Sequence, residues 1–135
     1  MKEFVRIIIE TEPGKYLLSH EIREGIAEHD LWNFPGGRRE EEDLTAKDAA
    51  RRELKEELGY DTDNLKLIHE VVLTFSFGER KGFFFLTQAK ISDFKINEPD
   101  KCIEFRSFTL DEMKKMNISI AVKEILEKGI LNSKS

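Results

Sequence analysis

The stretch TAKDAARRELKEELGY, residues 45–60, decides the fold of this 135-residue chain and holds its most informative side chains. Thr45 and Asp48 have the spacing of a helix N-terminal capping box, with Asp in place of the usual Glu or Gln. Small and apolar residues follow at helical spacing, and Gly59 stands where a helix commonly ends. The pattern predicts an amphipathic helix from about Thr45 to Leu58.

Acidic side chains gather on one face of this predicted helix. Glu53, Glu56 and Glu57 are separated by three and four positions, and such residues are neighbours on a helix surface. Leu54 and Leu58 point elsewhere, toward the core. Carboxylates held this close repel each other unless a positive charge intervenes, and their hard oxygens favour Mg²⁺, with Mn²⁺ as an alternative. Taken alone, the same residues also fit an ordinary solvated helix face.

Composition limits the classes of function. The chain is 39% hydrophobic and its length suits one domain, which we place at residues 1–131, with a frayed tail at 132–135. The net charge is −5 and no stretch concentrates Lys and Arg, so polymeric nucleic acid is not an expected partner.

Cysteine content and hydropathy give the expected compartment. Cys102 is the only cysteine, so the chain has no intramolecular disulfide and no cysteine spacing for a metal. No window approaches the roughly 20 apolar residues of a membrane span, and the first residues do not fit a secretory signal. We therefore expect no membrane association and a cytoplasmic location.

Short patterned runs divide the rest of the chain into strands and one further helix. The pattern predicts strands over Phe4–Glu10, Lys15–Ile22, Leu65–Phe77, Gly82–Ala89 and Cys102–Phe108, a short apolar segment at Leu31–Phe34 and an amphipathic helix over Leu110–Lys128. Residues 22–30 fit either a loop or a short helical turn, and residues 78–81 fit a polar turn. The continuous apolar run at 83–86 predicts a strand covered on both faces. Together these predict an α/β fold, a mixed sheet between helices.

The segment from Gly37 to Tyr60 resembles the Nudix box, the signature of the Nudix hydrolases. That signature runs Gly, five residues, Glu, seven residues, then Arg-Glu-apolar-x-Glu-Glu-x-Gly-apolar. Its second half is matched by Arg52, Glu53, Leu54, Glu56, Glu57, Gly59 and Tyr60, with the aromatic Tyr60 a mild departure. The preceding WNFPGG, residues 32–37, is similar to the lead-in of MutT-type members. The resemblance implies a Nudix-type α/β/α sandwich and a metal-dependent nucleotide pyrophosphohydrolase.

The first half of the box departs from the signature. Fourteen residues separate Gly37 from Arg52, where the signature has thirteen. The first acidic position falls on Asp43 when counted forward from Gly37, and on Leu44 when counted back from Arg52. We infer one extra residue in the loop 38–43, which leaves open the acid that fills this position.

Roles for individual residues follow from the resemblance. The three helix glutamates would bind the metal ion, with the carbonyl of Gly37 as a backbone ligand and Arg52 orienting the carboxylates. One of these carboxylates would double as the general base. A run similar to Glu98-Pro99-Asp100-Lys101-Cys102 occurs in nucleotide-cleaving relatives, where a loop glutamate reaches the metals. Glu98 is thus a further catalytic candidate, and its alternative role is that of an ordinary turn residue.

Candidates for substrate binding lie before the box. Trp32 and Asn33 match a Trp-Asn pair of relatives that hydrolyse oxidised purine nucleotides, and would line a base pocket. The alternative for Trp32 is a partly buried core residue. Arg23 is a candidate for contacting phosphate, although an isolated arginine after a strand is usually solvated.

The resemblance leaves several functions open. The small size favours cleavage of a nucleoside triphosphate, modified or oxidised bases included, into the monophosphate and pyrophosphate. ADP-ribose and dinucleoside polyphosphates are the alternative substrates. A non-catalytic nucleotide-sensing domain would usually have lost box glutamates, which are intact here, and an RNA-directed role would need a basic surface. A homodimer is compatible with the family.

Overall fold

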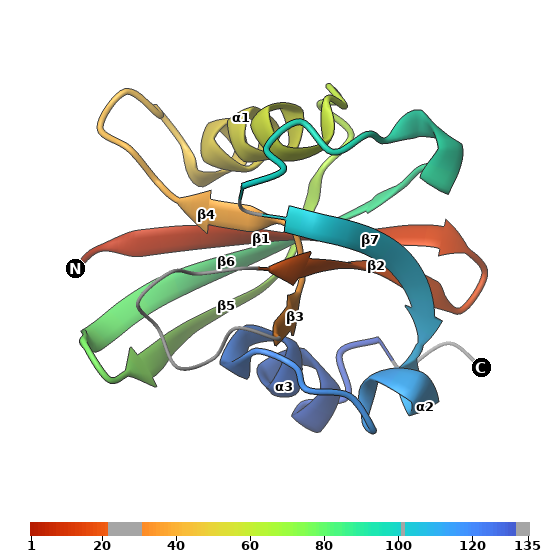
Figure 1. The fold of residues 1–135 in the computed structure, drawn as a ribbon. Coiled ribbons are helices and arrows are strands. Elements are labelled where there is room, and N and C mark those ends of the chain that lie inside the picture. The colour runs from red at the N-terminus through yellow and green to blue at the C-terminus, as the bar shows by residue number, and fades with distance from the viewer. Residues whose placement is uncertain (22–30, 101, 132–135) are drawn as a thin grey trace.

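The computed structural model describes residues 1–21, 31–100 and 102–131 (Figure 1). The elements are β1 (Glu3–Glu12), β2 (Lys15–Glu21), β3 (Leu31–Asn33), β4 (Gly36–Arg38), α1 (Ala46–Leu58), β5 (Lys66–Phe75), β6 (Gly78–Gln88), the 3₁₀ turn η1 (Ile91–Asp93), β7 (Cys102–Thr109), α2 (Leu110–Met113) and α3 (Ile120–Glu127). The predicted loop or turn at 22–30 and the predicted tail at 132–135 lie outside the described residues. None of the helices described is long and apolar enough to cross a membrane.

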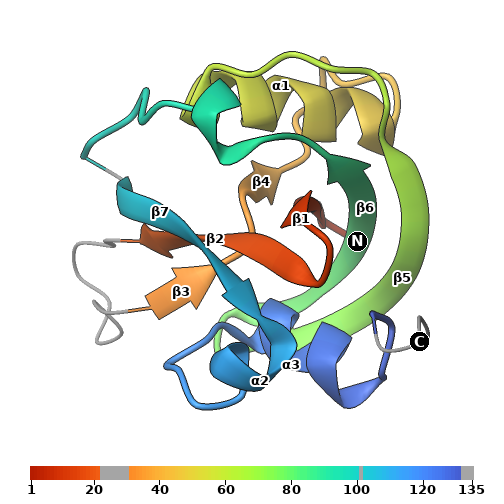
Figure 2. The same cartoon turned by 90° about the vertical axis from the view of Figure 1, so that its right-hand side faces the viewer.

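The strands form one mixed sheet that forks. β1 pairs in parallel with β6 along its length, and the other pairings are antiparallel. At its opposite edge β1 pairs first with β4 and, near the hairpin, with β2. β2 runs alongside β7 and also pairs with β3. The β1–β2 hairpin therefore opens away from its turn, and β3 and β4, joined by Phe34 and Pro35, enter the opening (Figure 2).

Helices cover both faces of the sheet, so the predicted α/β/α sandwich is confirmed (Figure 1). On one face, α1 packs on side chains of β1, β2 and β6, including Ile7, Leu17 and Phe85. On the other face, α2 and α3 cover a second cluster that contains Ile8 and Phe84. Neighbouring residues of β6 thus enter opposite cores, as the continuous apolar run predicted.

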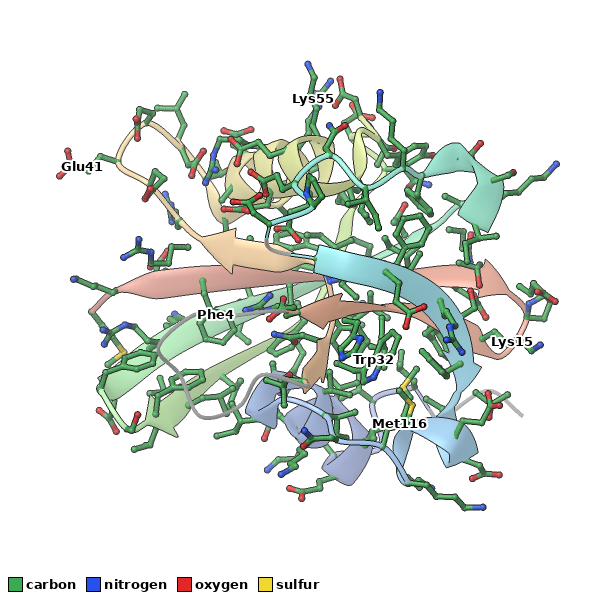
Figure 3. All side chains as sticks on the ribbon, in the orientation of Figure 1. Phe4, Lys15, Trp32, Glu41, Lys55 and Met116 are labelled. Atoms are coloured by element: carbon green, nitrogen blue, oxygen red, sulfur yellow. The ribbon has the colours of Figure 1, made fainter. Side chains whose placement is uncertain are left out.

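Local signals define α1 at both ends. The Thr45 hydroxyl accepts a hydrogen bond from the Asp48 backbone N–H at 3.1 Å, which satisfies a donor that the first helical turn leaves free. At the other end Gly59 has φ +64° and its N–H donates to the Lys55 carbonyl. Leu54 and Leu58 are fully buried, as predicted. Lys55 points away from the sheet (Figure 3).

The β5–β6 hairpin turns earlier than predicted. The turn falls at residues 76–77 and β6 already begins at Gly78, so the prediction of a turn at 78–81 was wrong. The polar residues 79–81 lie in β6 at the exposed end of the hairpin, where the strand does not pack on a hydrophobic core. Arg80 lies over the ring of Phe77 at 4.7 Å, and Phe77 stacks on Phe75.

The C-terminal helix is interrupted, so the prediction of one continuous helix over Leu110–Lys128 was also wrong. Between α2 and α3 the backbone N–H of Trp32 donates to the Asn117 carbonyl, and the Ser119 N–H donates to the Trp32 carbonyl. Ser119 then caps α3 through its hydroxyl. Backbone pairing of residues 117–119 with Trp32 of β3 is therefore favoured over a continuous helix. The same hydrogen bonds hold the start of α3 beside β3, the strand that precedes β4.

Leu54→Ala tests the packing of α1. We expect a loss of about 2–5 kcal/mol in the free energy of unfolding, because a fully buried leucine leaves a cavity between α1 and the sheet. Leu44→Ala is the matched control: Leu44 is 84% exposed, and its change stays within about 0.5 kcal/mol. Urea denaturation measures both, and equal effects would contradict the packing described.

Candidate functional site

The guanidinium group of Arg52 lies at the centre of the acidic cluster. Its Nε and Nη2 donate to the two carboxylate oxygens of Asp43, at 3.0 and 2.8 Å. Its Nη1 donates to Glu53 and to Glu56, each at 3.2 Å, and Nη2 also reaches the Arg38 carbonyl at 3.0 Å. Because one cation bonds three carboxylates, it offsets part of their repulsion and fixes their directions.

Asp43 is one of the two residues that counting leaves for the first acidic position of the box. It is 8% exposed, and besides Arg52 it accepts a hydrogen bond from the backbone N–H of Glu40 at 2.8 Å. The hydrogen bond from Arg52 is the main cause that lowers the pKa of Asp43 below its ordinary value. Leu44, the alternative, is 84% exposed. Asp43 is the residue reached by counting from Gly37, and its hydrogen bonds with Arg52 favour it over Leu44, while the place of the extra residue stays a prediction.

The glycine turn before the box presses against the helix. A β-carbon at Gly37 would lie 2.5 Å from a carboxylate oxygen of Glu53, so a larger residue there would displace that side chain. Gly36 packs as tightly on β1: its φ is +155°, and a β-carbon would lie 2.0 Å from the Val5 carbonyl oxygen. The backbone at Gly37 therefore lies close to the carboxyl group of Glu53.

Glu57 is the least compensated member of the cluster. Burial is the main cause that raises its pKa above the ordinary range of a carboxyl group, and a hydrogen bond with the Glu53 side chain raises it further. The positive charge of Arg6 acts in the opposite direction. Two carboxyl groups held this close repel each other when both are ionised, and a bound cation would relieve that repulsion.

The donor set fits a hard divalent cation, although the side chains are not arranged around one. Among the described residues, no three His, Cys, Asp or Glu side chains converge in a geometry that would hold an ion. Arg52 lies between Glu53 and Glu56, so binding an ion requires the carboxylates to turn from it. Carboxylate and backbone oxygens are the ligands that Mg²⁺ and Mn²⁺ prefer.

The loop that carries Glu98 is fastened to the end of α1. The backbone N–H of Asn97 donates to the Glu57 carbonyl at 2.9 Å, and its side-chain amide donates to the Lys55 carbonyl at 3.2 Å. Glu98 follows directly and is partly buried, with its own carbonyl accepting from the Cys102 N–H. The structure thus brings this predicted residue to the helix end that bears Glu57.

Trp32 and Asn33, two of the candidates for substrate binding, differ in their burial and in their contacts. Trp32 is partly buried against the core that α3 covers (Figure 3). Its ring stacks on that of His20, with centroids 4.5 Å apart. This matches its alternative role as a partly buried core residue. Asn33 is 3% exposed. Its side-chain oxygen Oδ1 accepts a hydrogen bond from the Ser119 hydroxyl at 2.7 Å, and its side-chain nitrogen Nδ2 donates to a Glu21 carboxylate oxygen at 3.5 Å. Arg23 lies outside the described residues.

Sequence reasoning missed a buried charge pair in the fork of the sheet. Arg6, in the middle of β1, is 8% exposed, and its Nη1 lies 3.6 Å from a carboxylate oxygen of Glu21. The same nitrogen donates to the Phe34 carbonyl at 3.0 Å. A signal existed, since Arg6 is the only charged residue in the apolar run FVRIII, residues 4–9.

Comparison with known proteins identifies the class. A family model described as the NUDIX domain matches residues 3–128. The chain therefore belongs to the Nudix family and is a Nudix hydrolase, an enzyme class acting on acid anhydrides. No curated protein matches the chain at a significant level.

Solved structures share the fold at low sequence identity. A MutT protein from Methanosarcina mazei Go1 superposes with a TM-score of 0.82 at 20% identity, covering 99% of this chain and 96% of the other. A MutT NUDIX hydrolase from Burkholderia pseudomallei gives 0.79 at 24% identity, covering 93% and 95%. The NUDIX domain of Shewanella oneidensis NrtR, complexed with ADP ribose, gives 0.75 at 17% identity, covering 93% and 84%.

Asp43→Asn tests whether Arg52 needs this partner. We expect a loss of about 1.5–3 kcal/mol in the free energy of unfolding, because the change leaves the hydrogen bonds of Arg52 without their ionised acceptor. Glu42→Gln, an exposed residue of the same loop, should have almost no effect. Chemical denaturation compares the two variants, and an unaffected Asp43→Asn would remove Asp43 from the network.

Glu57→Gln tests the raised pKa in protein treated with EDTA. A carboxyl group whose folded-state pKa is raised stabilises the fold at low pH, and this contribution is lost as pH rises above the ordinary value of 4.5. At pH 8 the glutamine variant should therefore melt about 3 °C or more above the wild type, with the difference vanishing near pH 4.5. Thermal melts across this range measure it, and a less stable variant at pH 8 would contradict the assignment.

Proposed function

We propose that the chain hydrolyses a phosphoanhydride bond of a nucleoside triphosphate, giving the nucleoside monophosphate and pyrophosphate. The observation that carries the proposal is one acidic cluster beside the backbone at Gly37: Arg52 holds Glu53 and Glu56, and Glu57 lies against Glu53. A solvated acidic face would not hold a partly buried carboxyl group such as that of Glu57 against another. This favours a cation-binding role over an ordinary helix surface.

The three glutamates would hold Mg²⁺, or Mn²⁺, with the Gly37 carbonyl as a further ligand. When bound, the ion supplies charge neutralisation at phosphate oxygens and makes a water molecule more acidic. Arg52 keeps its paired hydrogen bonds with Asp43 and so stays in place while Glu53 and Glu56 turn away from it. A carboxylate accepts the proton of the attacking water: Glu57 or another helix glutamate, or Glu98 from the adjoining loop.

The substrate is a single nucleotide in this proposal. A net charge of −5 disfavours a nucleic-acid backbone, whereas a triphosphate brings its own cation. Asn33, with its amide oriented by Ser119, is our candidate for a base contact, Trp32 would border the same pocket, and Arg23 would contact phosphate. ADP-ribose is the second candidate, because a structural neighbour with the same fold was solved with ADP ribose.

Further properties belong to the same proposal. The three helix glutamates are present, which favours catalysis over nucleotide sensing alone. A single domain over residues 1–131 stays a prediction, and the family match over residues 3–128 supports it. A cytoplasmic location, from cysteine usage, and a homodimer, from the family, stay predictions.

A substrate panel tests the reaction. Nucleoside triphosphates, oxidised nucleotides, ADP-ribose and dinucleoside polyphosphates are each incubated with Mg²⁺ or Mn²⁺, and products are separated by ion-exchange chromatography. We expect triphosphates to give monophosphate and pyrophosphate with the highest kcat/KM. Release of orthophosphate, or efficient cleavage of ADP-ribose alone, would contradict the proposal.

Variants then test the residues in the same assay. Glu57→Gln should lower kcat at least about a thousandfold, because the change removes a ligand charge without changing shape. Glu41→Gln, in the exposed loop before α1, is the control and should be fully active (Figure 3).

Glu98→Gln should reduce kcat less than Glu57→Gln does, and no reduction would remove Glu98 from the mechanism. An unchanged ranking of bases in Asn33→Ala would end its proposed role.

A further inference from the structure

The buried Arg6–Glu21 pair has no place in the mechanism above. Both side chains are almost enclosed, with 9% and 12% of their surface exposed. Their closest atoms are 3.6 Å apart, and the Nε of Arg6 has no hydrogen-bond partner within the described structure. A buried pair with such loose geometry is poor evidence for a role in stability, because an apolar pair of similar volume often stabilises a fold as well or better.

The contacts of Arg6 point instead to the turn that leads into the site. Phe34 and Pro35 join β3 to β4 and lie outside both strands. Two hydrogen bonds hold their carbonyl groups on β1: Arg6 Nη1 donates to Phe34 at 3.0 Å, and the Ile7 backbone N–H donates to Pro35 at 2.7 Å. Phe34 is fully buried, so without Arg6 its carbonyl loses a partner that water does not easily replace.

Gly36 and Gly37 connect the Phe34–Pro35 turn to the acidic cluster. Gly36 pairs with Arg6 in register and has no room for a side chain against β1. Gly37 follows, and the position of its missing β-carbon lies 2.5 Å from Glu53. A displacement of the turn by a fraction of an ångström therefore changes the space available to Glu53.

We propose that Arg6 is a positioning residue for the metal site, which it sets through the Phe34 carbonyl and the glycine turn. Glu21 compensates the buried positive charge of Arg6. Glu21 also accepts a hydrogen bond from Asn33, the residue proposed to contact the nucleotide base. This inference rests on the proposed function, since it assumes that Glu53 and the backbone at Gly37 bind the ion. Nothing in it requires Arg6 to touch substrate.

The experiment compares Arg6→Met, Glu21→Gln and the double variant with the wild type. The double variant removes one positive and one negative charge, so the net charge stays the same. Because both charges also act on Glu57, Arg6→Lys is measured beside it, since lysine keeps the positive charge but not the geometry of the guanidinium group. Three quantities are measured: the melting temperature, the affinity of EDTA-treated protein for Mn²⁺ by electron paramagnetic resonance, and the Mg²⁺ concentration giving half-maximal activity. The matched control is Arg51→Met with Asp61→Asn, a bidentate pair on the exposed side of α1.

We expect the double variant to melt near the wild-type temperature and to bind Mn²⁺ at least about tenfold more weakly. Its half-maximal Mg²⁺ concentration should rise by the same factor, while KM at saturating Mg²⁺ changes less than threefold. The Arg51 and Asp61 control should keep wild-type values. A double variant with wild-type Mn²⁺ affinity would overturn the inference and leave the proposed function standing.

Two results separate the remaining cases. If the wild type itself binds no Mn²⁺, the proposed function fails together with this inference. If the methionine variants do not fold, Arg6→Lys replaces them, because lysine keeps the charge but not the guanidinium geometry that reaches Phe34 and Glu21. A lysine variant with weakened Mn²⁺ binding supports the positioning role, and one with wild-type affinity contradicts it.

Discussion

The structure depends on keeping several negative side chains together at the end of a helix that must also pack on a sheet. Arg52 makes this arrangement tenable: it holds Asp43 with two hydrogen bonds and reaches Glu53 and Glu56 with another nitrogen. On the same helix Leu54 is fully buried against the sheet, so the acidic residues are fixed relative to β4. Burial, together with the neighbouring Glu53, raises the pKa of Glu57 on the same helix.

The forked sheet explains how distant segments reach this helix. The opening of the β1–β2 hairpin admits the short connection from β3 to β4, and this connection delivers Gly37 to Glu53. The same fork contains the buried Arg6, and the start of α3 is fastened to its far side through Ser119 and Asn33. The fork between β1 and β2 therefore adjoins both the proposed metal ligands and the proposed base contact.

Sequence patterns predicted the parts of this structure that are decided locally. The span of α1, its cap at Thr45 and its end at Gly59 follow from neighbouring residues, and so do most strands. The break before α3 was missed because backbone pairing with Trp32, a distant residue, overrides a continuous helical pattern. The Arg6–Glu21 pair was missed for a similar reason: nothing in the local pattern shows which partner an arginine meets across a sheet. The acid at position 43 was left open because spacing alone does not say where a loop absorbs an extra residue.

Anomalous diffraction from crystals soaked in Mn²⁺ and a non-hydrolysable triphosphate analogue tests the central claim most directly. The claim predicts an anomalous peak bounded by the carboxylates of Glu53, Glu56 and Glu57 and the carbonyl of Gly37, with Arg52 still bonded to Asp43. A bound analogue with no peak at these atoms, and with the carboxylates still on Arg52 and on each other, would contradict it.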